Sequence, residues 1–272
     1  MTDARDPDRY AHGHHDSVLR SHRWRTAENS AAYLLPHLRP RDRLLDVGVG
    51  PGTITVDLAE RLRDGWVTGI DSAEEAVTAT RDLASERGVG RITAEVGNVY
   101  ALAYAGDSFD VAHAHQVLQH LSDPVAALTQ MRRVVRPGGL VAARDADYDA
   151  MTWYPADPRL DRWLVLYSRV ARAAGGEPDA ARRMRHWAQQ AGFRSVTCTA
   201  STWCFASPED VAWWSETWAE RVVRSAFATQ AVEAGLADPA ELAELSAGWR
   251  WWGDQPDAWF AVLHGELLAE VP

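Results

Sequence analysis

The sequence predicts an α/β fold: a doubly wound, mostly parallel sheet followed by a mainly helical C-terminal region that caps it. Three observations support this prediction. Short apolar segments alternate with amphipathic helical segments between residues 43 and 144, a glycine-rich loop follows the first apolar segment, and the pattern becomes mainly helical after Asp149. Strands that alternate with helices are most simply joined as a parallel sheet with helices on its faces. Hydrophobic residues make up 46% of the 272-residue chain, enough for a large packed core.

The first half of the chain supplies the alternating elements. Apolar residues near helical spacing predict a helix over residues 23–38, with Pro36 near its end. Strands are predicted at Arg43–Val47, Trp66–Ile70, Arg91–Val96, Phe109–Ala112 and Leu140–Arg144. Helices are predicted at Thr53–Arg63, Ala73–Arg87 and Pro124–Val135. Asp123 is suited to cap the last of these helices, because a proline follows it at the first helical position.

The second half of the chain is predicted to be mainly helical, unlike the alternating strands and helices of the first half. Helices are predicted at Asp161–Ala174, Ala180–Ala191, Pro208–Glu233, Pro239–Ala247 and Pro256–Glu270, and an antiparallel strand pair at Phe193–Thr199 and Thr202–Phe205. The run from Ser207 to Asp210 is a strong helix start, since it combines a cap, a first-turn proline and first-turn acids. We therefore expect a mobile arm or lid over residues 1–22 and a ligand-binding core over 23–149. Residues 150–272 would hold the remaining strands and a helical substrate cap.

Composition and charge narrow the class of partner. The net charge of −10 opposes binding to a nucleic-acid backbone, which clustered Lys and Arg would recognise. The sequence contains no apolar run of membrane-spanning length and no signal peptide, so we expect a cytoplasmic protein. Cys198 and Cys204 are too few for a disulfide scaffold and match no metal motif, and no metal site is expected. The sequence is compatible with a homodimer.

The sharpest motif is the loop from Asp46 to Gly52, with the sequence DVGVGPG between a predicted strand and a predicted helix. Glycines allow a tight turn and a close approach of a ligand to the backbone. Dinucleotides require the spacing Gly-x-Gly-x-x-Gly, and Thr53 stands where the third glycine of that pattern belongs. The carboxylate of Asp46 suits instead a cationic ligand without phosphates, such as S-adenosylmethionine with its ammonium and sulfonium groups.

A second signal is Asp71, which closes the second predicted strand. An acid at this position can accept hydrogen bonds from both hydroxyls of a ribose. Because dinucleotides and S-adenosylmethionine both contain ribose, Asp71 supports nucleoside binding without choosing between them.

These motifs resemble those of class I S-adenosylmethionine-dependent methyltransferases, and most closely the branch of ubiquinone and menaquinone biosynthesis. The resemblance continues through three further stretches: GNV at 97–99, DSFDV at 107–111 and LQHLSDP at 118–124. It ends with MRRVVRPGG at 131–139. Each stretch alone is weak evidence, but five in family-like order over residues 42–145 are specific. The resemblance implies a Rossmann-like fold and S-adenosylmethionine as the cofactor.

The resemblance also implies the cofactor-binding residues. The loop glycines and Asp46 would hold the methionine end, Asp71 the ribose, and the segment after the third strand the adenine. The full set is Asp46, Gly48, Gly50, Gly52, Asp71, Ser72, Gly97, Asn98, Val99, His115 and Gln116, of which the last two would lie near the sulfonium. The usual residue at Asn98 is Asp, and Asn accepts through its carbonyl oxygen without the charge.

Candidates for catalysis and acceptor binding lie near the ends of the fourth and fifth predicted strands. His120 or His115 could take a proton from the acceptor; the alternative is that both are satisfied polar residues. Polar side chains after the fifth strand and aromatic side chains of the cap could contact the acceptor; the alternatives are a solvated loop and ordinary core packing. These acceptor-contact candidates are Asp145, Asp147, Tyr148, Trp214 and Trp218.

The sequence therefore predicts an enzyme that moves a methyl group from S-adenosylmethionine to O, N or C of a small aromatic or hydrophobic molecule. One alternative is a regulatory protein that binds S-adenosylmethionine without catalysis. A nicotinamide-dependent dehydrogenase is disfavoured by the glycine spacing.

Overall fold

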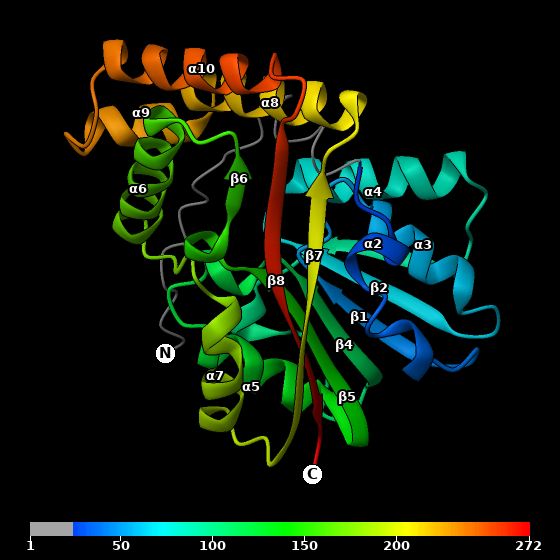
Figure 1. The fold of residues 1–272 in the computed structure, drawn as a ribbon. Coiled ribbons are helices and arrows are strands. Elements are labelled where there is room, and N and C mark those ends of the chain that lie inside the picture. The colour runs from blue at the N-terminus through cyan, green and yellow to red at the C-terminus, as the bar shows by residue number, and fades with distance from the viewer. Residues whose placement is uncertain (1–23) are drawn as a thin grey trace.

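A computed structural model describes residues 24–272, which form a central sheet covered by helices on both faces (Figure 1). The arm predicted over residues 1–22 lies outside the described residues. The strand order is β3-β2-β1-β4-β5-β8-β6, and β7 pairs with β8. The strands are β1 (Arg43–Val47), β2 (Trp66–Asp71), β3 (Ile92–Val96), β4 (Phe109–His115), β5 (Val135–Ala146), β6 (Thr152–Tyr154), β7 (Ser195–Phe205) and β8 (Trp259–Glu270).

The first five strands are parallel, and their order reverses between β1 and β4. In doubly wound sheets, ligands bind in the crevice outside the carboxyl ends of the strands at such a reversal. Strand β8 runs antiparallel to β5, β6 and β7. The sheet is therefore Rossmann-like at one side and antiparallel at the other, and the predicted α/β fold class is confirmed.

Helices cover the two faces of the parallel strands. One face carries α2 (Ala27–Ser30) and α3 (Thr53–Arg61), with α4 (Glu74–Glu86) beside α3. The other face carries α5 (Pro124–Val134) and α7 (Met184–Gln190). Leu44 and Val67 belong to the core on the α2–α3 face, whereas Leu45 and Val47 belong to the core on the α5–α7 face. This alternation along β1 is what a strand buried on both faces requires.

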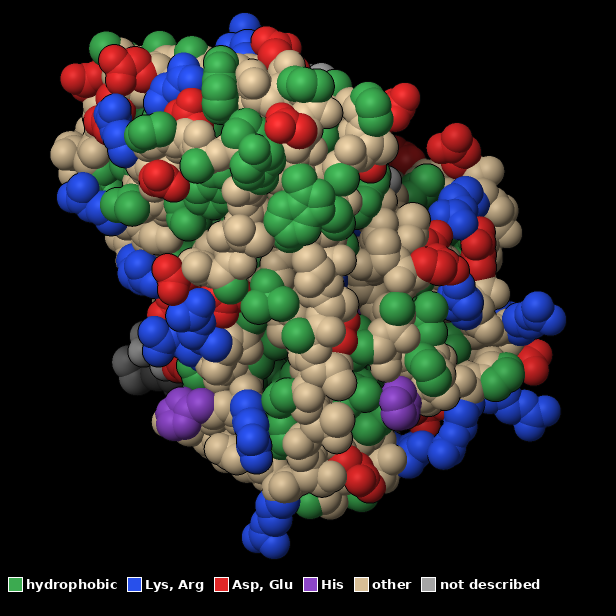
Figure 2. Space-filling model, viewed as in Figure 1, with side chains coloured by type: hydrophobic (Ala, Val, Ile, Leu, Met, Phe, Trp, Pro, Cys, Tyr) green, Lys and Arg blue, Asp and Glu red, His purple; other side chains and the backbone are tan. Residues whose placement is uncertain are grey.

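A third layer lies beyond the carboxyl edge of the parallel strands. It contains α6 (Pro158–Ala173), α8 (Pro208–Arg224), α9 (Ala226–Glu233) and α10 (Pro239–Gly253), seen at the top of Figure 1. Its core is aromatic, with Trp163 fully buried against Trp218 at 4.5 Å and Trp249 at 4.8 Å between ring centroids. Figure 2 shows hydrophobic side chains gathered on the outer surface of this layer too. No helix of residues 24–272 combines the length and apolarity needed to cross a membrane.

Short 3₁₀ turns connect several of these elements. They are η1 (Leu35–His37), η2 (Val99–Ala101), η3 (Leu118–His120), η4 (Tyr148–Ala150) and η5 (Ala181–Arg183). The turns η2, η3 and η4 follow β3, β4 and β5, so they line the carboxyl edge of the sheet.

The structure corrects the prediction of one helix over residues 23–38. The segment contains only α2 and η1, separated by a turn. Thr26 caps α2 and Pro36 lies in η1, so the apolar side chains of this segment reach the core without a continuous helix. The predicted cap of α5 is confirmed, since the Asp123 carboxylate accepts from the N–H of Ala126 at 2.9 Å.

Four predictions for the second half were wrong. The strand pair predicted at 193–199 and 202–205 is the single strand β7, and the helix predicted at 256–270 is β8. The two strands pair with each other along their whole length, from Ser195 opposite Glu270 to Phe205 opposite Phe260. Pairing between segments more than 50 residues apart overrides the helical propensity of Leu, Ala and Glu in β8.

The remaining two corrections concern helix boundaries. The helix predicted at 208–233 is divided at Ser225, whose hydroxyl accepts from the N–H of Phe227 and so caps α9. Helix α10 continues to Gly253, so Trp249, Trp251 and Trp252 are helical and do not lie in a connection. Trp249 and Trp252 are fully buried, whereas Trp251 is exposed.

Candidate active site

The glycine loop after β1 has the conformation that its sequence predicts. Gly48, Gly50 and Gly52 all have positive φ, at 75°, 53° and 83°. A Cβ atom at Gly48 would lie 2.4 Å from the Val117 side chain, and one at Gly52 would lie 2.7 Å from Thr80. These glycines are therefore required both for the turn and for its close packing.

Asp71 lies at the carboxyl end of β2 and holds this loop. Its carboxylate accepts from the N–H of Gly50 at 3.0 Å and from the N–H of Ala73 at 3.1 Å. Each oxygen keeps a further lone pair, so the carboxylate can still accept from a ribose. The loop and the acid predicted to bind one nucleoside are thus in direct contact.

Asp46 is more deeply buried than expected for a residue that would contact the cofactor directly. One of its oxygens accepts from the Thr55 hydroxyl at 2.6 Å, and the other pairs with Nδ1 of His113 at 2.7 Å. Asp46 and His113 are both buried. This carboxylate ties β1 to α3 and β4, which favours a role in supporting the loop over direct contact with a cofactor.

The end of β3 lies beside that of β2. The N–H of Gly97 donates to the carbonyl of Asp71 at 2.9 Å, and a Cβ atom at Gly97 would lie 3.1 Å from Ile70. Asn98 caps η2, because its Oδ1 accepts from the N–H of Tyr100 at 2.9 Å. Ser72 is exposed, and Val99 begins η2. The acid, the amide and the glycine backbone form a set of groups suited to ribose and adenine.

At the end of β4, Gln116 adopts a left-handed backbone conformation with φ of 53°. Its Oε1 accepts from Arg25 at 2.6 Å, so its Nε2 donates to Nε2 of His264 at 2.8 Å. The Nδ1 proton of His264 then donates to the carbonyl of Val262 at 3.1 Å. This chain of hydrogen bonds fixes His264 as the neutral Nδ1–H tautomer and joins the segment just before α2 to the end of β4 and to β8.

A row of polar side chains crosses the sheet next to Gln116. His115, Arg144, Glu266 and Thr199 occupy matched positions on β4, β5, β8 and β7. Arg144 is 1% exposed, and its Nε donates to the Ser201 hydroxyl at 3.1 Å. Burial lowers the pKa of Arg144 to about 10, so the guanidinium remains charged at neutral pH.

The two histidine candidates for proton transfer are both buried among groups that keep them neutral. Burial, followed by the charges of Arg144 and Arg25, lowers the pKa of His115 well below its usual value. Burial lowers the pKa of His120 to about 3, and its Nε2 lies 3.0 Å from the amide nitrogen of Gln119. An imidazole with so low a pKa is a weak base, which disfavours both histidines as efficient general bases.

Asp145 lies next to these groups on the opposite face of β5. Its Oδ1 accepts from the N–H of Gln119 at 3.1 Å, while its Oδ2 is buried and has no hydrogen-bond partner among residues 24–272. Burial raises the pKa of Asp145 to about 7. The pKa of Asp145 is therefore close to neutrality.

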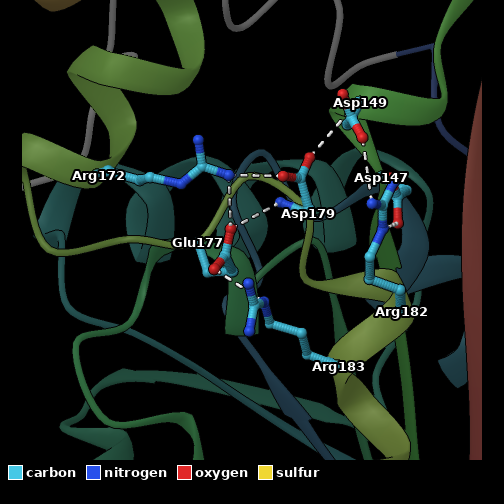
Figure 3. Close-up of polar contacts among 7 residues, drawn as sticks. All are labelled: Asp147, Asp149, Arg172, Glu177, Asp179, Arg182 and Arg183. Carbon is cyan, nitrogen blue, oxygen red and sulfur yellow. Dashed lines mark hydrogen bonds and ion pairs between the residues drawn. The ribbon is translucent and has the colours of Figure 1, made fainter.

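Asp147 and Tyr148 are held by other parts of the protein. Asp147 accepts from Nε of Arg182 at 2.7 Å, in a network that also contains Asp149, Arg172, Glu177, Asp179 and Arg183 (Figure 3). Tyr148 stacks on Tyr167 with ring centroids 4.0 Å apart. Both arrangements fix the segment after β5 against α6 and η5, which favours a structural role for these two side chains.

Trp214 and Trp218 lie inside the aromatic core of the third layer. Trp214 is 6% exposed and stacks on Phe205 at 4.2 Å, and Trp218 is 1% exposed. Trp203 and Trp24 lie closer to the polar row, since the Trp203 ring is 4.9 Å from the Arg144 guanidinium and 5.2 Å from the ring of Trp24. For Trp214 and Trp218, these contacts favour ordinary core packing over contact with the acceptor.

Sequence reasoning missed several residues of this site. Arg25, Tyr33, Trp203 and His264 were not singled out. The segment of His264 was predicted to be helical, so its place beside His115 could not be deduced. Arg144 carried a usable signal, because a charged residue ends an otherwise apolar buried strand, LVAAR.

Comparisons with known proteins agree with this geometry. A family model described as a methyltransferase domain matches residues 38–201. An uncharacterized methyltransferase of Schizosaccharomyces pombe is 34% identical over 268 residues, covering 95% of each chain. A ubiquinone/menaquinone biosynthesis C-methyltransferase of Bdellovibrio bacteriovorus is 39% identical, but over only 37% of this chain and 42% of its own length. The YcgJ protein of Bacillus subtilis has the same fold, with a TM-score of 0.60 at 17% identity over 90% of this chain and 99% of its own.

Proposed function

The chain belongs to the methyltransferase-domain family, and from this premise we propose that it methylates a small aromatic or hydrophobic molecule. Membership of the family makes it an S-adenosylmethionine-dependent methyltransferase. We assign the cofactor to the segment over residues 23–149 and the acceptor mainly to residues 150–272. The branch of quinone biosynthesis, which the motifs resemble, is one source of candidate acceptors.

One observation carries the assignment of the cofactor site. The glycine loop and Asp71 are in direct contact at the reversal of strand order, where the sheet would receive a nucleoside. Asp71 would hold the ribose, Asn98 and Val99 would face the adenine, and the backbone around Gly48 and Gly50 would hold the methionine end. Asp46 would act through the loop that it supports.

The cofactor would supply a methyl group on a positively charged sulfur: the acceptor would attack the methyl carbon in line, and the carbon–sulfur bond would break so that S-adenosylhomocysteine leaves. The residues of the chain then have to hold the acceptor in line and keep water out, and such positioning supplies a large part of catalysis in transfers of this kind. The third layer is suited to both tasks, because it is apolar and extends beyond the carboxyl edge of the parallel strands.

We assign the group that removes a proton from the acceptor by comparing the pKa values of the candidate side chains. His115 and His120 remain candidates by position, but their lowered pKa values make them weak bases. Asp145, with a pKa raised to about 7, is better matched to a proton transfer near neutral pH.

The proposal is tested by a turnover screen. The protein is incubated with S-adenosylmethionine carrying a labelled methyl group and with phenols, quinol precursors, indoles and amines, and transfer of the label is measured. Label on at least one of these acceptors supports the proposal. Tight binding of the cofactor with no transfer to any hydrophobic acceptor would favour the regulatory alternative.

A further inference from the structure

The polar row contains a charged group whose hydrogen-bonding capacity is only partly used. Nη1 and Nη2 of Arg144 are buried and have no hydrogen-bond partner among residues 24–272. The nearest carboxylate, that of Glu266, lies 3.6 Å from Nε and is already held by the Thr199 hydroxyl at 2.7 Å. Buried guanidinium nitrogens without partners are costly, and an anion would satisfy them.

Two further side chains near Arg144 also have buried polar atoms without a hydrogen-bond partner. Both ring nitrogens of His115 and the hydroxyl of Tyr33 are buried without a hydrogen-bond partner within the described part of the chain. The charge of Arg144 acts on both groups: it lowers the pKa of His115, and it opposes the rise that burial causes in the pKa of Tyr33. His115 lies directly opposite Arg144 in the sheet, and Tyr33 packs against the core cluster that contains Ala142, two residues before Arg144 on the same face of β5. We call Tyr33, His115 and Arg144 the Arg144 cluster.

A second guanidinium, that of Arg25, lies near the Arg144 cluster. Arg25 lies over the same Trp203 ring as Arg144, at 5.5 Å and 4.9 Å from its centroid. Burial, followed by the charges of Arg144 and Arg25, lowers the pKa values of His115 and His264. Among residues 24–272, Glu266 is the one carboxylate within 4.0 Å of the Arg144 guanidinium, and it leaves Nη1 and Nη2 without a partner, which favours a negatively charged ligand.

We propose that the Arg144 cluster binds an acidic oxygen of the methyl acceptor, either a carboxylate or the ionised hydroxyl of a phenol or enol. This inference rests on the proposed function and narrows its substrate class. The guanidinium would provide two parallel N–H donors, the geometry that suits a carboxylate. The Tyr33 hydroxyl and a ring N–H of His115 would donate the remaining hydrogen bonds.

The position in the sheet favours the acceptor over the cofactor as the source of this oxygen. The glycine loop and Asp71 follow β1 and β2, whereas Arg144 is on β5, two strands beyond β1. Neighbouring strands are about 4.8 Å apart, so the Arg144 backbone lies about 10 Å from that of β1. The other side of Arg144 adjoins β8 and β7, which lead into the third layer.

The test uses acetate as a small carboxylate probe, because the natural acceptor is not identified. Wild-type protein saturated with S-adenosylhomocysteine is titrated calorimetrically with acetate and, as a neutral control of the same shape, with acetamide. The ionic strength is held constant with sodium chloride. We expect acetate to bind at least tenfold more tightly than acetamide. Equal binding of the two, or no binding of acetate to a protein that binds S-adenosylhomocysteine, would overturn the proposal.

Three variants locate the site. Arg144→Met should weaken acetate binding at least tenfold. Arg136→Met, at the opposite end of the same strand, removes the same charge and should leave acetate binding unchanged. Tyr33→Phe should weaken acetate binding roughly threefold to tenfold, the range for one lost hydrogen bond. Its fold should be retained, since the deleted hydroxyl has no partner among the described residues. Undiminished acetate binding in Tyr33→Phe and Arg144→Met would contradict the assignment.

A second titration separates the two sources of a carboxylate. S-adenosylhomocysteine contains the amino-acid carboxylate, and methylthioadenosine lacks it. If Arg144→Met binds both compounds as wild type does, the Arg144 cluster serves the acceptor, as proposed. Selective loss of S-adenosylhomocysteine would assign the cluster to the cofactor and overturn the acceptor assignment. Failure of wild-type protein to bind either compound would instead refute the proposed function.

Discussion

The two sides of the sheet are built from different kinds of core. Around β1, β2 and β4, the core consists mainly of Leu, Val, Ile and Ala side chains together with Phe109 of β4, and Trp66, the Trp residue of β2, is 40% exposed. Beyond β5, the core of the third layer contains six buried Trp residues: Trp163, Trp203, Trp214, Trp218, Trp249 and Trp252. The first region places backbone groups and short polar side chains at the sheet edge, and the second places a large aromatic mass beside the buried guanidinium of Arg144.

This difference supports the proposed division between a cofactor region and an acceptor region. A nucleoside cofactor is recognised by groups that short loops between parallel strands can supply. The hydrophobic acceptor that we propose would require an apolar wall, which large aromatic side chains in a helical layer are suited to form. The comparison therefore predicts that changes in the aromatic layer alter stability or acceptor use, while changes in the glycine loop region alter cofactor affinity.

The largest effect should come from Trp163→Ala in the aromatic core. Loss of a fully buried Trp typically costs about 3–5 kcal/mol of unfolding free energy, whereas Trp66→Ala should cost less than about 1 kcal/mol. Denaturant unfolding of both variants measures the contrast. Trp163→Phe should lose less than Trp163→Ala, because the Phe ring refills part of the volume that Ala leaves empty. Similar losses at Trp163 and Trp66 would contradict the difference between the two cores.

The next effect concerns Asp145, between the two regions. Its folded-state pKa of about 7 lies above its usual value, so the folded protein keeps a proton that the unfolded chain releases. Stability should therefore fall as the pH rises from about 4 to about 7, and then level off. Asp145→Asn should remove this fall and gain on the order of 2–4 kcal/mol over wild type at pH 8, with little gain at pH 4. Denaturant unfolding of the variant and of wild type at pH 4 and pH 8 measures this effect. Parallel dependence of stability on pH in the two proteins would contradict a buried, neutral carboxyl at Asp145.

A smaller effect is expected on the cofactor side. Asp71→Ala removes the acceptor for Gly50 N–H as well as the proposed contacts with the ribose. Hydrogen bonds to charged groups contribute about 1.5–3 kcal/mol, so affinity for S-adenosylhomocysteine should fall tenfold or more. Asp71→Asn keeps one oxygen and should lose less. If the melting temperature falls sharply in both variants while affinity is retained, Asp71 is structural.

The smallest effect tests a local signal inside the second region. The Ser207 hydroxyl accepts from the N–H of Asp210 at 3.1 Å and caps α8, as its sequence predicts. Ser207→Ala should cost about 1 kcal/mol, while Ser207→Asp should restore the cap. Chemical unfolding of both variants provides the measurement; an unchanged midpoint in Ser207→Ala would mean that the helix start does not depend on its cap.

The same contrast explains what the sequence could predict. The strands and helices from β1 to α5 follow from local signals: glycines with positive φ, Asp123 as a cap, and apolar residues at fixed spacing. Strand β7 was predicted only as a pair of shorter strands, and β8 was predicted as a helix, because the pairing that defines both strands spans α8, α9 and α10. The segment Trp259–Glu270 carries mixed local signals, because its Leu, Ala and Glu residues favour a helix while its Trp, Phe and Val residues favour a strand.

The residues of the candidate site also fall into two groups: those that local spacing predicts, and those whose contacts depend on β7 and β8. Asp71 and the glycine loop were predicted because their spacing along the chain fixes their place at the sheet edge. The contacts of Arg144 with Ser201, Trp203 and Glu266 depend on β7 and β8, so an incorrect assignment of those strands hid them. His115 was placed correctly at the end of β4, but its burial beside two guanidinium groups could not be deduced from spacing.

The most direct test of the account is calorimetric titration of S-adenosylhomocysteine into wild type, Asp71→Ala and Arg144→Met, with NAD as a second ligand. The account predicts that wild type binds S-adenosylhomocysteine far more tightly than NAD. It also predicts that Asp71→Ala binds S-adenosylhomocysteine tenfold or more weakly, and Arg144→Met within about twofold of wild type, a free-energy change below about 0.5 kcal/mol. Tighter binding of NAD, or equal losses in the two variants, would contradict a cofactor site confined to the region of the glycine loop.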